Sequence, residues 1–254
     1  MKKLLFFIGL SFLVFNVSAR EAAEARVFTP QAGDFALSID ATPFLNFAGN
    51  IFGSEATAPS FNNGVLRGRY FLSERNAIRA TLAFDFGTDI YRIDVPQIGN
   101  TSNTVTNTER FSHNEFVLAV GYEFRRGAGR LQAFYGGELI FGLGNERDSF
   151  TYGNALGANN TASRVTERKS GAMFGVGLGG FVGVEYFIAP RISLGAEVGI
   201  SLLYNNQGRG QTTSERWADG SVQTSTVDGT RSSGQFEFST NAAHGGNIFI
   251  SFFF

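Results

Sequence analysis

The sequence predicts an all-β fold, an eight-stranded antiparallel up-and-down β-barrel that crosses a membrane, and three observations predict it. Eight segments alternate apolar and polar side chains with a period of two, which is typical of strands with one apolar face. The connections between these segments alternate between short turns and long polar stretches. The charged side chains of the eight segments fall on one face, so the apolar face carries none.

The eight segments have roughly the 9–11 residues that a tilted strand needs to cross a bilayer. They are Phe35–Phe47, Val65–Leu72, Ala77–Phe86, Asn114–Phe124, Leu131–Leu143, Ala172–Phe187, Ile192–Tyr204 and Phe236–Phe254. The long connections, residues 48–64, 87–113, 144–171 and 205–235, are rich in Asn, Thr, Ser and Gly. We expect them to be structureless loops, and loops of that length argue against a compact soluble domain.

Composition excludes several other classes of protein. The net charge is −1, so the chain has no electrostatic bias toward nucleic acid. No cysteine is present, which excludes a disulfide framework. The 28 Phe and 32 Gly residues favour many strands with close backbone packing over a helical bundle. A soluble barrel of the lipocalin type is the competing all-β fold, but it needs the apolar face inside and lacks the large difference in loop length.

The first part of the chain has the features of a targeting segment. Residues 1–19 combine a positively charged start, an apolar run and a small-residue cleavage site at 17–19, as a secretory signal peptide does. A membrane anchor is the alternative, although the apolar run is short for one. Residues 20–34 are predicted to be a flexible lead, and residues 35–254 to form the barrel domain.

The last strand carries a specific pattern. Ile248, Ile250, Phe252 and Phe254 share one face of this strand, and Phe254 is the last residue. This pattern resembles the signal that the outer-membrane barrel-assembly machinery of Gram-negative bacteria reads. Over residues 35–254 the chain resembles the small outer-membrane barrels of the OmpA/OmpX type, also called porin-family barrel domains. It departs from OmpA because no periplasmic domain follows the last strand.

The resemblance implies a location in the bacterial outer membrane, with short turns in the periplasm and long loops outside the cell. The implied partners are outer-membrane lipids and lipopolysaccharide, the barrel-assembly machinery during insertion, and an extracellular ligand that the sequence does not identify. Members of this group mostly serve envelope integrity, adhesion or surface contact, so a non-enzymatic role is expected. The alternatives are a lipid-A-modifying barrel enzyme and a narrow, low-conductance channel.

Aromatic residues of the apolar face gather at both ends of the predicted strands, as expected at the two membrane interfaces. The lower rim would carry Tyr70, Tyr122, Phe124, Tyr186, Phe252 and Phe254. The upper rim would carry Phe47, Phe86, Phe116, Phe141, Phe174, Tyr204 and Phe238. Turning this face toward lipid avoids a cost of roughly 2–4 kcal/mol for each arginine at the midplane.

The polar face is predicted to form a charged network inside the barrel. Its members are Asp40, Arg67, Arg69, Arg79, Asp85, Glu123, Glu138, Glu185 and Glu197. With Glu115 added, acids outnumber bases seven to three. The positions of these residues along neighbouring strands suggest an Asp40–Arg67 pair and an Arg79–Glu123 pair. A buried polar plug is the favoured interpretation, and a path for protons or cations is the alternative.

Bulky inward side chains are expected to fill the rest of the interior, because an eight-stranded barrel is only wide enough for side chains. We expect these residues to lie over the inward-facing glycines. They are Phe44, Phe71, Phe134, Phe181, Phe187, Phe249 and Phe253.

No catalytic, cofactor-binding or metal-binding residue is predicted, and no cofactor is expected. An enzyme of this fold would need a nucleophile and a base within hydrogen-bond reach. The only histidines are His113, which has Ser112 and Glu115 beside it, and His244 on the apolar face of the last strand. Two explanations of His244 stay open: a position near the upper interface, or a bulge over residues 242–246 that turns it inward.

The last long connection contains the single tryptophan of the chain. Trp217 lies between Arg216 and Asp219. Trp and Arg are enriched at binding hot spots, so Trp217 is a candidate anchor for a ligand of the loops. Packing against a neighbouring loop is the alternative.

Overall fold

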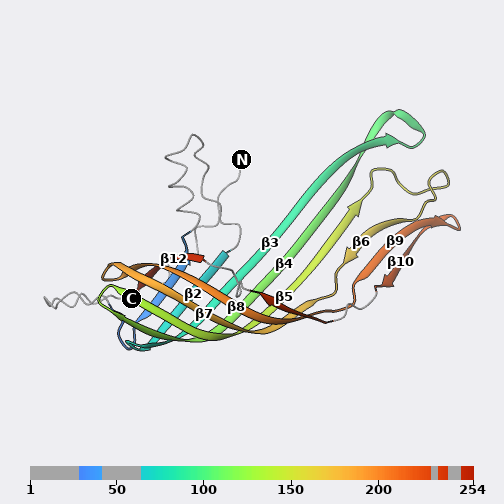
Figure 1. Ribbon diagram of the computed structural model, residues 1–254. Helices are drawn as coiled ribbons and strands as arrows, with labels where there is room; N and C mark the ends of the chain where they lie inside the picture. Colours follow the sequence, from blue (N-terminus) through green and yellow to red (C-terminus); the bar gives the residue numbers. More distant parts are fainter. Residues whose placement is uncertain (1–28, 42–63, 230–233, 240–246) are drawn as a thin grey trace.

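The computed structural model describes residues 29–41, 64–229, 234–239 and 247–254 (Figure 1). Within these ranges every regular element is a β-strand, and all twelve strands belong to one antiparallel sheet. The prediction of an all-β antiparallel fold is therefore confirmed. The predicted signal peptide and nearly all of the connection 48–64 lie outside the described residues.

The described strands differ widely in length. They are β1 (Phe35–Asp40), β2 (Gly64–Ser73), β3 (Asn76–Gln97), β4 (Asn100–Ala128), β5 (Leu131–Thr151), β6 (Arg164–Lys169), β7 (Met173–Ala189), β8 (Ile192–Gln207), β9 (Gln211–Ala218), β10 (Ser221–Asp228), β11 (Gln235–Ser239) and β12 (Asn247–Phe253). Strands β3 and β4 have 22 and 29 residues, far more than a bilayer crossing requires.

Eight strands pair in a cycle that returns to its start. The order is β1, β2, β3, β4, β5, β7, β8 and β12, and β12 pairs with β1. Ile39 of β1, for example, lies opposite Leu66 of β2 on one side and Ile250 of β12 on the other. The first and last strands therefore lie side by side, although more than 200 residues separate Ile39 from Ile250 in the sequence.

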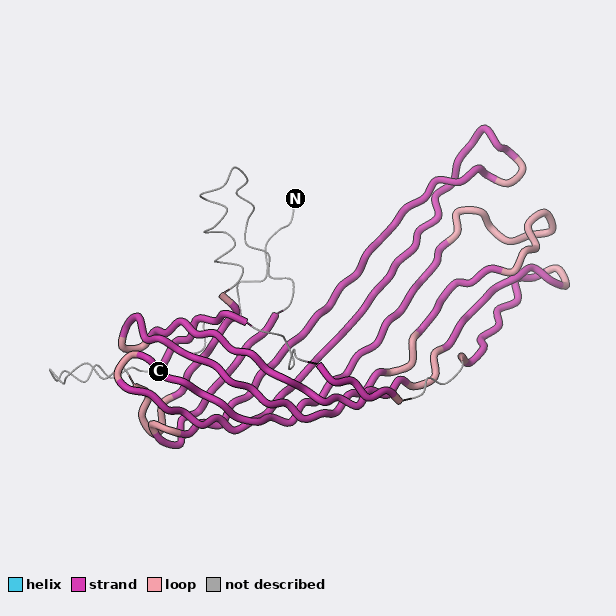
Figure 2. The backbone as a smooth tube through the Cα atoms, in the orientation of Figure 1, coloured by secondary structure: helices cyan, strands magenta, loops and turns pink. Residues whose placement is uncertain are grey.

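Strands β3, β4 and β5 continue beyond this cycle. There they form an open sheet with β6, β9 and β10, in the order β3-β4-β5-β6-β9-β10. Figures 1 and 2 show that this sheet projects well past the curved group of strands at the other end of the molecule. We call residues 87–113, residues 145–151 and strands β6, β9 and β10 the sheet extension.

The sheet extension corrects the predicted loops at residues 87–113, 144–171 and 205–235. Strands β3 and β4 stay in register from Asn76–Phe124 up to Pro96–Thr104, so most of the first predicted loop is strand. Strands β6, β9 and β10, together with the division of the predicted last strand into β11 and β12, raise the number of described strands from the predicted eight to twelve. The three stretches are rich in Thr, which favours strands. Their polar side chains fall on both faces, so the alternation that identified the other strands is missing.

The predicted last strand is divided into β11 and β12, which both pair with β8. Seven residues separate Ser239 from Asn247, but only three separate their partners Ser201 and Glu197. The register along β8 therefore shifts by four residues. The predicted bulge at 242–246 and His244 lie outside the described residues.

The two faces of the paired strands differ as the alternation predicts. Along β8, Ser193, Glu197 and Ser201 are buried, whereas Leu194 and Val198 between them are exposed. The same alternation runs along β7 and β5. Large apolar side chains therefore cover the exposed face, whereas charged residues, small polar residues and phenylalanines occupy the buried one.

Three of the seven phenylalanines predicted for the interior lie over glycines, namely Phe134, Phe181 and Phe249, and Phe44 lies outside the described residues. The ring of Phe249 covers Gly195, and an added Cβ at Gly195 would lie 2.3 Å from its Cζ atom. The ring of Phe134 covers Gly183 in the same way. Phe71, Phe187 and Phe253 instead cluster with two alanines, Ala36 and Ala77.

A Gly195→Ala substitution is expected to lower the free energy of unfolding by about 1–3 kcal/mol, because Phe249 is buried and its ring has no room to move. Chemical unfolding followed by far-UV circular dichroism measures the loss. Gly137→Ala is the matched control, since its new Cβ would meet only a backbone oxygen of Gly179 at 3.5 Å. Adding Phe249→Leu to Gly195→Ala should restore part of the lost stability. Equal stability of the two alanine variants would contradict the close packing of Phe249 over Gly195.

Candidate functional site: a buried arginine–glutamate network

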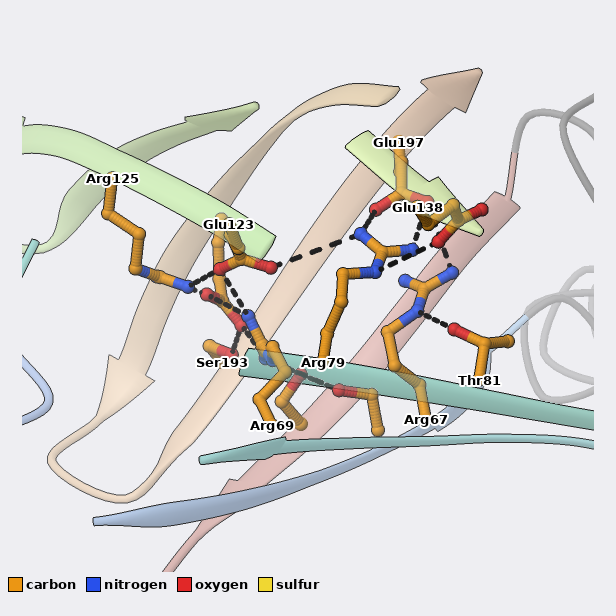
Figure 3. A network of polar contacts seen from close by, with 12 residues as sticks. Arg67, Arg69, Arg79, Thr81, Glu123, Arg125, Glu138, Ser193 and Glu197 are labelled. Carbon is orange, nitrogen blue, oxygen red and sulfur yellow. Dashed lines mark hydrogen bonds and ion pairs between the residues drawn. The ribbon is translucent and has the colours of Figure 1, made fainter. Parts of the chain in front are cut away.

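Four arginines and four glutamates meet in the buried space between the paired strands (Figure 3). Arg67 and Arg69 lie on β2, Arg79 on β3, Glu123 and Arg125 on β4, Glu138 on β5, Glu185 on β7 and Glu197 on β8. All eight are buried. Charges removed from water are tolerated when they are paired and hydrogen-bonded, so the geometry of the pairs decides whether this network is stable.

Glu185 is the centre of one half of the network. Arg69 donates to both of its carboxylate oxygens, from Nη2 to Oε1 at 2.8 Å and from Nη1 to Oε2 at 3.0 Å. Arg125 donates to Oε2 from the other side, and the Ser193 hydroxyl donates to Oε1. Two-pronged contacts between arginine and carboxylate are among the strongest hydrogen bonds in proteins, so this half is held rigidly.

Glu197 is the centre of the other half. Arg79 donates from Nη1 to Oε2 at 2.8 Å and from Nη2 to Oε1 at 3.0 Å, and Arg67 reaches Oε1 at 3.1 Å. Glu138 Oε2 lies 3.4 Å from Arg79 Nε. The Arg79 guanidinium also lies 3.6 Å from the centre of the Phe181 ring, in a cation–π contact.

Glu123 connects the two halves. Its Oε1 atom lies 2.7 Å from Arg125 Nη1 and 3.5 Å from Arg69 Nη1, and its Oε2 atom lies 3.9 Å from Arg79 Nη1. The four positive and four negative charges of the network cancel. This balance differs from the predicted excess of acids, because Arg125 adds a fourth positive charge and Asp40, Asp85 and Glu115 are not among the eight residues of the network.

The structure brings together seven of the nine predicted network residues, and the Arg79–Glu123 contact is one of the two predicted pairs. The predicted Asp40–Arg67 pair stays a prediction. Asp85 lies apart from the network, with its Oδ1 atom 3.5 Å from Nε2 of a partly exposed histidine.

Arg125 is the network residue that sequence analysis missed, because the predicted strand ends at Phe124. Strand β4 continues to Ala128, so Arg125 points inward like Glu123 two residues earlier. Extending the period of two by one step beyond the predicted end of the strand would have found it.

His113 and Ser112, the residues that the alternative of a barrel enzyme would use, do not point toward each other. Neighbouring residues of a strand point to opposite faces, and the Ser112 hydroxyl bonds to Thr88 Oγ1 at 3.1 Å. The His113 ring lies over Gly87 and beside Asp85. Ser112 and His113 therefore do not meet as a nucleophile and a base.

A cavity of about 520 Å³ opens above the network where the sheet extension begins. Its lining includes His113, Glu115, Glu146 and Glu237. Within the described ranges, no group of His, Asp or Glu side chains is arranged to hold a metal ion. No helix among the described residues is long and apolar enough to cross a membrane.

Trp217 lies on a strand rather than in the predicted loop. It belongs to β9 of the sheet extension, opposite Val222 of β10, and it is partly buried. Its role as a binding anchor stays a prediction.

Comparisons with known proteins give distant structural likenesses. No protein-family model matches the sequence, and no curated protein matches it either. The outer membrane protein OprG from Pseudomonas aeruginosa is similar with a TM-score of 0.30 and 12% identity, over 90% of this chain and 99% of that one. A major outer membrane protein from Thermus thermophilus is similar with a TM-score of 0.37 and 12% identity, over 88% and 100% of the two chains. Both TM-scores are low, so neither likeness assigns a function.

Proposed function

We propose that this chain is an integral outer-membrane β-barrel of eight strands that acts without enzymatic activity, through its surface. The observation that carries the proposal is the cycle of eight paired strands with an apolar exposed face and a charged buried face. Backbone groups in lipid must all be hydrogen-bonded within the protein, and a closed antiparallel sheet meets that demand. The apolar face then contacts lipid, and the arginine–glutamate network fills the interior.

The exposed face supports this proposal because its side chains suit lipid and not water. Leu139, Leu178 and Val198 are each at least half exposed, and their neighbours on that face are apolar. A monomer in water rarely exposes a continuous apolar surface of this extent. The apolar band therefore spans the membrane, with the sheet extension on the outer side.

Two further parts of the chain fit export to the outer membrane. Residues 1–19 act as a cleaved signal peptide, and the closing strand guides insertion by the barrel-assembly machinery. Ile248, Phe252 and Phe254 of that strand are exposed, and Ile250 is partly exposed, as a lipid-facing assembly signal requires. The sheet extension, with Trp217 near its tip, is the surface that contacts an extracellular ligand.

The network favours a plugged barrel over a conducting channel. Reconstituted in a planar bilayer, the chain is expected to insert and to show no stepwise conductance, because buried ion pairs join side chains from six strands across the interior. Single-channel recording measures this, and a porin of known conductance is the positive control. Stepwise conductance that changes with Arg67→Ala or Glu138→Ala would instead favour the channel, and failure to enter lipid vesicles would reject the membrane barrel itself.

A further inference from the structure

Four basic residues lie on one face of the sheet extension, and this face continues the apolar, lipid-facing surface. Arg92 is on β3, Arg110 on β4, Arg147 on β5 and Lys169 on β6. The pairing of β4 is regular from Phe116 to Arg110, an even number of residues, so Arg110 points to the same side as Phe116. An even number of residues also separates Arg92 from Phe86 and Arg147 from Leu143, so these pairs share a face in the same way.

The pairing also makes these residues neighbours across the strands. Arg110 lies opposite Ile90 and Ser149, so Arg92 and Arg147 are its diagonal neighbours on the two adjacent strands. Arg147 in turn lies directly opposite Lys169. The four cations therefore form one diagonal row, which we call the basic row.

The basic row has more positive than negative charge. Among the described residues, Arg92 and Arg110 form no ion pair, and both are exposed. Arg147 and Lys169 share one carboxylate, Glu167, and their hydrogen bonds, chiefly that of Lys169, lower the pKa of Glu167. The four cations thus lie close to two carboxylates, that of Glu167 and that of the nearby Asp94, which accepts a hydrogen bond from the Thr106 hydroxyl. Arginines left exposed and unpaired in this way are available to an anionic partner.

The distance of the basic row from the apolar surface, measured along the strands, indicates which anion it contacts. Arg147 lies four residues beyond Leu143, and Arg110 lies six residues beyond Phe116. At about 3.3 Å per residue this is roughly 13–20 Å along the strands, and less along the membrane normal because the strands are tilted. The row therefore lies just outside the hydrocarbon layer, at the level of lipid headgroups.

We propose that the basic row binds the phosphate groups of an anionic glycolipid in the outer leaflet, while the apolar surface below it contacts the acyl chains of the same molecule. The proposal rests on the membrane barrel proposed above. Arginine suits this role because its planar group can donate two parallel hydrogen bonds to a phosphate. A lipid fits better than a soluble anion, since only a lipid contacts both the basic row and the apolar surface that continues from it.

The test compares the full chain with the triple variant R92Q/R110Q/R147Q, each refolded in detergent micelles. Binding of fluorescent phosphorylated lipopolysaccharide is measured beside the same material after enzymatic removal of its phosphates. Each exposed charge contributes on the order of fivefold, so the loss of three should weaken binding of the phosphorylated form by about a hundredfold. Removing the phosphates should weaken the unchanged chain to the same degree.

R216Q is the matched control, because Arg216 is exposed on the opposite face of the sheet extension. It should bind as the unchanged chain does. Circular dichroism and the heat-dependent shift in gel mobility check that all three proteins fold. If the unchanged chain inserts into vesicles but binds both forms equally, or if the triple variant binds normally, the basic row has no such role. If no protein inserts, the membrane barrel is wrong instead.

Discussion

Replacing Glu185 with leucine is expected to lower the free energy of unfolding by about 3–5 kcal/mol, one of the two largest effects we predict. Glu185 is fully buried and is the carboxylate that Arg69 and Arg125 share. Its loss leaves two buried guanidinium groups beside a single remaining carboxylate, Glu123. Breaking a buried ion pair by removing one partner is strongly destabilising, because the other charge stays out of water.

The measurement is chemical unfolding of the refolded chain in lipid vesicles, followed by far-UV circular dichroism. Glu115→Leu is the control, since Glu115 also lies on the polar face but is exposed at the rim, and it should cost less than about 0.5 kcal/mol. The double variant Arg69→Met/Glu185→Leu removes one charge of each sign, so it should be more stable than Glu185→Leu alone. Equal losses for Glu115→Leu and Glu185→Leu would show that the network does not stabilise the interior.

A neutral network explains how the interior can hold so many charges. Buried ion pairs often add little net stability compared with apolar side chains of the same size. Their cost falls when every carboxylate has more than one donor, as Glu185 and Glu197 do. The network therefore specifies which strands lie opposite each other, because Arg69 finds Glu185 only when β2 and β7 are correctly placed.

Sequence analysis predicted the strands of the cycle and their faces because burial on one side imposes a period of two. The inward positions of Arg79, Glu138 and Glu197 follow from that period alone. So does the fit of Phe249 over Gly195, since a bulky side chain in a narrow interior needs a neighbour without one. These features depend on local alternation, which a sequence displays directly.

The sheet extension could not be predicted in the same way. Above the apolar band both faces of β3 and β4 carry polar side chains, as at Asp94 on one face and Glu109 on the other, and alternation no longer distinguishes a strand from a loop. Backbone pairing continues there because each strand extends the ladder that its neighbour has begun. The partners of Glu185 could not be predicted from the sequence for another reason. Contacts across the interior depend on the tilt of the strands and on their register together.

Replacing Leu139 with arginine is expected to cost about 2–4 kcal/mol in lipid vesicles, the second large effect. Leu139 lies on the exposed face of β5 between Val120 and Leu178, so in the proposed membrane barrel an arginine there would enter the hydrocarbon layer. Thr151→Arg is the matched control, because Thr151 is exposed on the same face of β5 but lies in the sheet extension.

The difference between these two variants measures whether the apolar face meets lipid. Unfolding in vesicles should show a large loss for Leu139→Arg and a change of less than about 0.5 kcal/mol for Thr151→Arg, which stays in water. A soluble barrel of this sequence would have Leu139 in its interior, and Leu139→Arg would then prevent folding even without lipid. Similar stability of the two variants in vesicles would mean that the face around Leu139 does not contact the membrane, and the assignment of the apolar band would be wrong.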